Sequence, residues 1–158
     1  MSARQMATIG VLVTATCVMA FAQSGPAVLT RDMQAKATDV FEHYVTLERA
    51  FDPAMADLYS RDAVIKNRRT YPTGQVREIT FGPAQYKDLI RQAMPVAKLR
   101  GDINLYSACK YTAEAERVRI GCTRYSKLKK YSSPISLLVG PGTNGEWLVF
   151  EELSESHP

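Results

Sequence analysis

The sequence predicts an α+β fold in which helices cover one face of a curved antiparallel sheet. Two helical segments and a β-hairpin come first, a further helix follows, and the rest of the chain has the pattern of long strands. The chain has 158 residues, of which 46% are hydrophobic, and these values fit one globular domain. A domain of this size buries roughly 68–70% of its unfolded surface, which is enough for a core without a metal or a set of disulfides.

The first 22 residues have the order of a secretory signal peptide. Arg4 precedes an apolar run over residues 7–20, and residues 20–22 (Ala-Phe-Ala) provide an A-x-A cleavage site. A membrane anchor is less favoured, because the run contains threonines and is shorter than the roughly 20 residues that span a bilayer. Acylation of Cys17, as in a lipoprotein, stays open. We expect residues 1–22 to be removed, residues 23–158 to form one domain, and the protein to be periplasmic or secreted, without membrane contact after cleavage.

The net charge of the chain argues against a nucleic-acid partner. The full sequence has 20 Lys and Arg against 16 Asp and Glu, a net charge of +4, and loss of Arg4 reduces it to +3. Domains that bind nucleic acid usually concentrate a larger positive charge on one face. We therefore expect no nucleic-acid partner.

The two cysteines that remain after cleavage are placed to form a disulfide. Residues 103–128 have the pattern of a hairpin that reverses at Ala115-Glu116, and in this register Cys109 lies opposite Cys122. A two-residue loop puts this pair at a non-hydrogen-bonded position, where side chains approach most closely. A reactive thiol pair and a metal site are the alternatives, but the first lacks a C-x-x-C spacing and the second lacks nearby histidines. We expect a structural cross-strand disulfide.

The clearest predicted helix follows Thr30, a suitable N-cap. Its apolar side chains recur at helical spacing and define one face, and Asp32 lies in its first turn, where a negative charge is favourable. Asp52-Pro53 ends this helix and opens a second, short one, with Asp52 as cap and Pro53 at the first position. The face of the first helix consists of Met33, Ala37, Val40, Tyr44, Leu47 and Phe51.

A hairpin and a third helix follow in the middle of the chain. Residues 63–69 and 76–81 have the character of strands, and Tyr-Pro-Thr-Gly at residues 71–74 suits the turn between them. Gly82-Pro83 starts the third helix, which we expect to end before Pro95, because proline disfavours helical geometry in the residue before it. The inward side chains of this helix should be Tyr86, Leu89, Ile90 and Ala93.

The C-terminal part is predicted to contain only strands after the cysteine hairpin. Residues 136–139 and 147–152 have strand character, and a glycine-rich loop over residues 140–145 joins them. Residues 154–158 have the composition of a loose tail.

Four segments of the chain carry a resemblance to a known family. They are Phe-Glu-His-Tyr at residues 41–44, Ala-Asp-Leu-Tyr-Ser-Arg-Asp-Ala-Val-Ile at residues 56–65, the helix start Gly82-Pro83, and Gly-Glu-Trp-Leu-Val-Phe at residues 145–150. In this order they resemble the nuclear transport factor 2-like superfamily, which includes SnoaL-like and ketosteroid isomerase-like proteins. The resemblance covers nearly all of the mature chain. It implies a cone: a strongly bent sheet wrapped on three helices, with a pocket at the open end.

The resemblance also allows a test for catalytic residues. Isomerase-type members have a carboxylate base at the end of the first strand, and the matching position here is Asn67, whose amide does not accept a proton near neutral pH. Tyr44 lies about where the family has a helix tyrosine, but it belongs to the apolar face and is expected in the core or the pocket wall. His43 and His157 are expected at the surface. We assign no catalytic residue and expect a pocket wall without a side chain that exchanges protons.

Basic residues offer the other candidate site. Strand alternation places Lys66 and Arg68 on one sheet face and Asn67 and Arg69 on the other. If the second pair points into the cone, it forms a polar, cation-lined pocket suited to a carboxylate or phosphate. A later strand segment carries further cations among tyrosines, for which a solvated sheet face is the favoured interpretation: Arg124, Lys127, Lys129 and Lys130 with Tyr125 and Tyr131.

These observations favour an exported domain that binds a small molecule or an anionic ligand, without catalysis and without a cofactor or metal. Two alternatives stay open: an isomerase or dehydratase of the same superfamily with an unrecognised acid–base pair, and an envelope or secretion subunit that binds another protein through its sheet. The resemblance also implies a homodimer through the sheet. The expected ligand-binding residues are Tyr44, Tyr59, Asn67, Arg69, Phe81 and Trp147.

Overall fold

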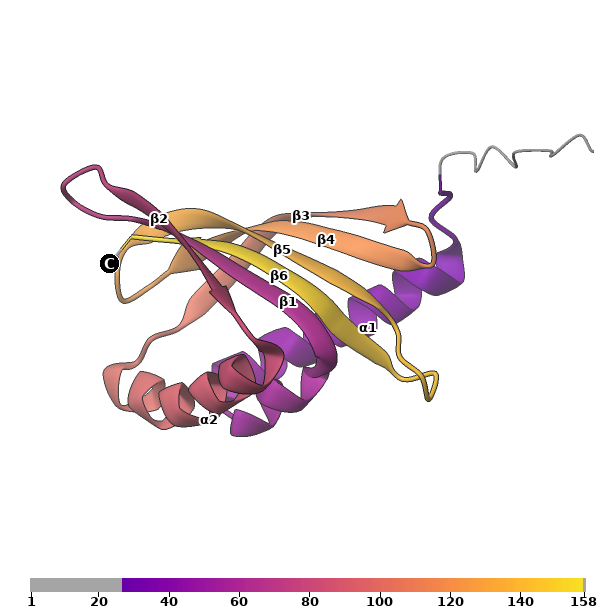
Figure 1. Ribbon diagram of the computed structural model, residues 1–158, viewed down its shortest axis with the longest axis horizontal. Coiled ribbons are helices and arrows are strands. Elements are labelled where there is room, and N and C mark those ends of the chain that lie inside the picture. Colours follow the sequence, from indigo (N-terminus) through magenta and orange to yellow (C-terminus); the bar gives the residue numbers. More distant parts are fainter. Residues whose placement is uncertain (1–26, 158) are drawn as a thin grey trace, which may run out of the picture.

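The computed structural model describes residues 27–157, so the predicted signal peptide lies outside the described residues. A six-stranded curved sheet wraps around the helices, which all lie on its concave side (Figure 1). This architecture confirms the predicted α+β cone. The elements in chain order are α1 (Arg31–Ala50), the short 3-10 helix η1 (Pro53–Leu58), β1 (Tyr59–Thr70), β2 (Val76–Phe81), α2 (Pro83–Arg100), β3 (Asn104–Glu114), β4 (Arg117–Ser126), β5 (Tyr131–Pro141) and β6 (Trp147–Ser156).

The first two helices begin and end where the sequence predicts. The Thr30 side chain accepts a hydrogen bond from the backbone N–H of Met33, and α1 ends at Phe51 in the left-handed conformation. Asp52 then caps η1 by accepting from the N–H of Ala54 at 2.8 Å. Ala37, Val40, Phe41 and Tyr44 are buried on the sheet side of α1.

The sheet is mixed rather than wholly antiparallel. The strand order is β2-β1-β6-β5-β4-β3, and β1 pairs with β6 in parallel while all other neighbours are antiparallel. The first and last strands of the chain therefore meet at the centre of the sheet. This corrects the expected purely antiparallel sheet, since a pairing between strands so far apart in the chain leaves no local sequence signal.

Helix α2 is longer than predicted. It passes through Pro95 and ends at Gly101, whose positive φ of 62° provides a left-handed C-cap. The expected stop at Pro95 is therefore wrong. Ile90 and Met94 are buried against the sheet and η1, and this packing outweighs the one backbone donor that the proline lacks. Leu89, expected inward, is 39% exposed.

The cysteine hairpin has the predicted register at its closed end. Glu114 pairs with Arg117 across the two-residue turn, and Cys109 and Cys122 form a disulfide with a Cα–Cα distance of 4.2 Å. A bulge interrupts the pairing beside the disulfide, where Ala108 has a positive φ of 53°. The predicted disulfide is thus present in the structure.

The last two strands extend beyond the predicted limits. Strand β5 begins at Tyr131, and β6 continues to Ser156, so the predicted loose tail from Ser154 is wrong. Pairing with both β1 and β5 holds this segment in the middle of the sheet. Residues 127–130, which were predicted to belong to a strand, instead form the turn between β4 and β5.

The core lies between the concave face of the sheet and the helices. Its largest fully buried side chains are aromatic and branched residues from α1 and the central strands. These core side chains are Tyr44, Tyr59, Ile65, Ile120, Leu137, Val118, Val139 and Val149.

No helix in residues 27–157 has the length and apolar character that a bilayer-spanning helix requires.

Candidate functional site

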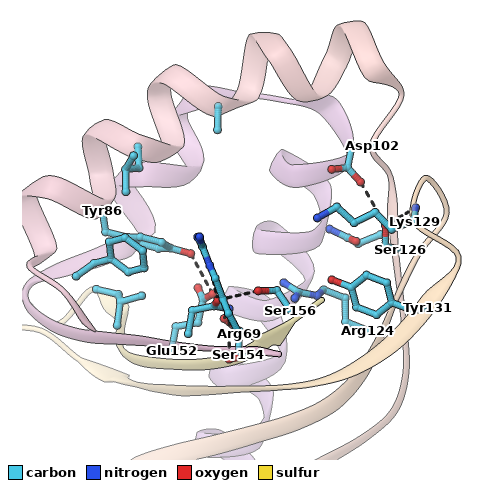
Figure 2. Close-up of a pocket in the computed structure, with 16 residues that line it drawn as sticks. Arg69, Tyr86, Asp102, Arg124, Ser126, Lys129, Tyr131, Glu152, Ser154 and Ser156 are labelled. Carbon is cyan, nitrogen blue, oxygen red and sulfur yellow. Dashed lines mark hydrogen bonds between the residues drawn. The ribbon is translucent and has the colours of Figure 1, made fainter. Parts of the chain in front are cut away.

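A cavity of about 540 Å³ lies between α2 and the concave face of the sheet. Its α2 side is mainly apolar, with Leu89 and Ala93 beside Tyr86, whereas its sheet side is polar (Figure 2). The residues that line it are Ile65, Asn67, Arg69, Phe81, Tyr86, Leu89, Ala93, Asp102, Asn104, Arg124, Ser126, Lys129, Tyr131, Glu152, Ser154 and Ser156.

Glu152 is a buried carboxylate in the wall of this cavity. The residue is only 2% exposed, and each carboxylate oxygen accepts one hydrogen bond from a tyrosine hydroxyl: Oε1 from Tyr86 at 3.0 Å and Oε2 from Tyr59. Burial, with the neighbouring Glu152 charge, raises the pKa of Tyr59 and Tyr86 well above the usual value, so both hydroxyls remain protonated donors. The cavity wall therefore contains an ionisable carboxyl group, which the sequence did not lead us to expect.

A chain of polar contacts continues along the sheet from Glu152. Asn67 donates to the Ser154 hydroxyl at 3.0 Å, and its amide oxygen accepts from Ser156 Oγ at 2.8 Å and from Arg69 Nε at 3.3 Å. Asn67 thus joins β1 to the end of β6 and orients the Arg69 side chain. In the pairing of β1 with β6, Arg69 lies opposite Ser156, and Figure 2 shows both side chains at the cavity.

Three cations line the cavity without a carboxylate partner. Among residues 27–157, no ion pair includes Arg69, Arg124 or Lys129, whereas the paired cations all lie elsewhere. Arg124 is half-buried and donates to neutral acceptors: the backbone carbonyl of Glu155 at 2.8 Å and Ser133 Oγ at 3.4 Å. The nearby charges of Glu152 and Glu48 raise the pKa of Arg124, so its guanidinium group stays charged, and a bound anion would make charge-assisted hydrogen bonds with the cations of this wall.

A second, partly buried acid, Glu48, lies near the cavity. Glu48, near the end of α1, accepts from Asn104 Nδ2 and from the Tyr106 hydroxyl, both at 2.8 Å. Burial raises the pKa of Glu48, although these two hydrogen bonds oppose the shift. Asn104 also lines the cavity, so Glu48 contacts the site through this one side chain.

The structure separates the six residues predicted to bind a ligand into three groups. Asn67, Arg69 and Phe81 line the cavity, as expected if the inward face of β1 points into the cone. Tyr44 and Tyr59 are core residues, 2% and 1% exposed. Trp147 packs on the core and does not line the cavity. His43 and His157 are exposed, as predicted.

Glu152, Arg124 and Tyr86 were not predicted as site residues. Alternation along β6 from Trp147 places Glu151 inward, but a bulge at Phe150 shifts the register: Val139 pairs with Val149 and Leu138 with Glu151. The extra residue turns Glu152 toward the cavity. In the sequence, this inward face of β6 is indicated only by polar residues at every second position: Glu152, Ser154 and Ser156.

Comparisons with known proteins support the fold. No family model and no curated protein matches the sequence. Among solved structures, an NTF2-like protein of unknown function from Pseudomonas putida matches with a TM-score of 0.63 and 11% identity, over 82% of this chain and 89% of that one. An NTF2-like protein with a cystatin-like fold from Novosphingobium aromaticivorans matches with a TM-score of 0.55 and 14% identity, over 78% and 81%.

A third solved structure holds a bound compound. It comes from Catenulispora acidiphila, is a complex with S-DNPA, and matches with a TM-score of 0.51 and 13% identity over 80% of this chain and 94% of that one. Identities this low establish architecture rather than activity. The resemblance drawn from the sequence is confirmed at this level: the chain has the NTF2-like, cystatin-like fold.

Proposed function

We propose that the protein binds a small organic anion in the cavity between α2 and the sheet. The observation that carries this proposal is a set of cations on one cavity wall, Arg69, Arg124 and Lys129, that form no ion pair within residues 27–157. The apolar residues opposite, Leu89 and Ala93, suit the body of such a molecule. The S-DNPA complex of the Catenulispora acidiphila structure supports a binding role for a fold of this kind.

Calorimetry with matched aromatic probes tests the anionic character of the ligand. We expect naphthoate to bind and the neutral, isosteric naphthamide to bind at least tenfold more weakly. Arg69→Gln and Arg124→Gln should each weaken naphthoate binding. Arg68→Gln is the matched control, because Arg68 directly precedes Arg69 on β1 but forms an ion pair with Glu155 on the outer face of the sheet. Equal binding of naphthoate and naphthamide, or no binding of either, contradicts the proposal.

We also propose that the protein acts outside the cytoplasm. The signal-like N-terminal segment supports this location, and so does the disulfide between Cys109 and Cys122, which persists in oxidising compartments. N-terminal sequencing of protein from the cell envelope should find Gln23 first, and an intact N-terminus contradicts cleavage. Native mass spectrometry of the same sample should detect a retained small molecule.

Acid–base catalysis is a second candidate, favoured by Glu152 alone. A buried carboxylate at a cavity wall, within hydrogen-bond reach of the Tyr86 hydroxyl, has the composition of a proton-transfer pair. The molecule retained in native preparations should then acquire deuterium at carbon in heavy water, and Glu152→Gln should slow this exchange by about 10²–10⁴-fold. Recovery of that molecule without deuterium leaves binding as the function.

A further inference from the structure

Glu152 has acceptor capacity that the protein itself does not use. A carboxylate has about four lone-pair positions, and the two tyrosine hydroxyls occupy one on each oxygen. No cation lies within ion-pair distance of this carboxylate in residues 27–157. A buried charge with open acceptor positions at a cavity wall is stabilised by any further donor that enters.

The surroundings of Glu152 decide which kind of donor fits. Arg124 lies close enough to Glu152 for the carboxylate charge to raise the pKa of its guanidinium group, and Arg69 lies on the same wall, opposite Ser156 in the pairing of β1 with β6. A ligand ammonium group at Glu152 would meet the repulsion of these guanidinium groups, whereas a neutral hydroxyl would not. The tyrosine hydroxyls are already committed to Glu152, and Asn67 is bonded to Ser154, Ser156 and Arg69. The hydroxyl oxygens of this wall keep acceptor lone pairs, but the Glu152 carboxylate is a charged and therefore stronger acceptor for a ligand hydroxyl.

Resting on the proposed anion binding, we propose that the ligand is a hydroxylated organic acid held at two points. Its anionic group lies against Arg124 and Lys129, and its hydroxyl donates to Glu152. The body between the two groups packs on the apolar side chains of α2. Glu152 thus acts as the residue that selects hydroxylated acids from acids of the same shape.

Matched pairs of aromatic acids test this selection. Benzoate, naphthoate and biphenyl carboxylate are compared with analogues that carry a hydroxyl at the end remote from the carboxylate, so that three lengths are sampled. At the length that fits, we expect the hydroxyl to tighten binding on the order of tenfold or more, the size expected for a hydrogen bond to a charged acceptor. A methoxy analogue, which has the oxygen but no donor, should show no gain.

Protein variants assign the effect to Glu152. Glu152→Gln should lose most of the hydroxyl gain, measured within the variant as the ratio of the Kd of each unsubstituted acid to that of its hydroxylated partner. Glu151→Gln is the matched control, because Glu151 is the preceding residue and accepts from Arg119 on the opposite sheet face. If Glu152→Gln does not fold, the hydroxy and methoxy pairs on the native protein still decide the question.

The outcomes separate the two proposals. Acids that bind equally with and without a hydroxyl, at all three lengths, overturn the role of Glu152 and leave anion binding in place. A hydroxyl gain that persists in Glu152→Gln overturns it as well. Failure of every acid to bind overturns the proposed function, and the hydroxyl selection with it.

Discussion

Glu152 is stable in a buried position because hydrogen bonds from two tyrosine hydroxyls replace those that its carboxylate would make with water. Transfer of a carboxylate out of water is costly unless hydrogen bonds compensate, and Tyr59 and Tyr86 supply one bond each. Their rings also pack edge to face, with centroids 5.3 Å apart. The two tyrosines and the carboxylate therefore form one structural unit, in which Tyr86 faces the cavity and Tyr59 the core.

Tyr59→Phe should destabilise the protein by about 2 kcal/mol, because it removes a buried hydrogen bond to a charged acceptor. The measurement is the free energy of unfolding from urea titration. Tyr125→Phe, on the outer face and 38% exposed, should change stability by no more than about 0.5 kcal/mol. Similar losses in both variants contradict the role assigned to the Tyr59 hydroxyl.

Glu48 predicts a pH dependence of stability. Its folded-state pKa is raised by burial, so the unfolded chain ionises Glu48 first and the folded state loses stability as pH rises from about the ordinary value of 4.5 through the raised pKa. Glu48→Gln should therefore be more stable than the native protein at pH 7, and this advantage should vanish below the unfolded pKa. Unfolding titrations at several pH values measure it, and an advantage that is largest in acid contradicts the assignment.

At the scale of elements, one β-bulge changes which side chain of β6 faces the cavity, and another lies beside the disulfide that links β3 to β4. The bulge at Phe150 turns Glu152 inward, and the one at Ala108 lies beside the disulfide in the β3–β4 hairpin. Both lie in strands whose remaining residues alternate regularly. A single inserted residue per strand is thus enough to change the chemistry of the site.

The disulfide is predicted to stabilise the hairpin without shaping the cavity. The cysteines are 13 residues apart, and closing such a loop contributes about 3 kcal/mol in the chain-entropy model. Cys109→Ser with Cys122→Ser should lower the free energy of unfolding by about that amount and leave naphthoate binding unchanged. Alkylation of the unreduced native protein followed by mass spectrometry should find neither cysteine modified, and two modified cysteines would remove the claim.

At the scale of the whole molecule, the sheet has one covered and one open face. The helices lie on the concave side of the sheet (Figure 1). The cavity lies on this side too, whereas the outer side exposes apolar side chains among its charges. Among the exposed large hydrophobic residues on the strands are Val64, Leu105, Tyr125 and Leu153. An open sheet face with such side chains is suited to association with a second copy.

We propose that the protein is a homodimer through this outer face. Light scattering should give twice the monomer mass, and Leu153→Asp should shift the equilibrium toward monomer, because it places a charge in the apolar contact. Lys36→Asp, on the surface of α1, serves as the control for added negative charge. A native protein that stays monomeric at high concentration contradicts the proposal.

Local patterns in the sequence determined much of this fold. The cap at Thr30, the helix face that contains Tyr44, the turn before Val76 and the pairing of Cys109 with Cys122 all depend on residues within about 15 positions of one another. Alternation along β1 also placed Asn67 and Arg69 together on one sheet face, and the structure shows that this face lines the cavity.

Only the tertiary structure decided the remainder. The parallel pairing of β1 with β6, the continuation of α2 through Pro95 and the inward turn of Glu152 each depend on contacts between segments distant in the chain. The cavity chemistry belongs to this second group. Its buried acid, Glu152, and its cations come from β1, β4, β6 and the turn after β4, and their juxtaposition is a property of the curved sheet rather than of any one segment.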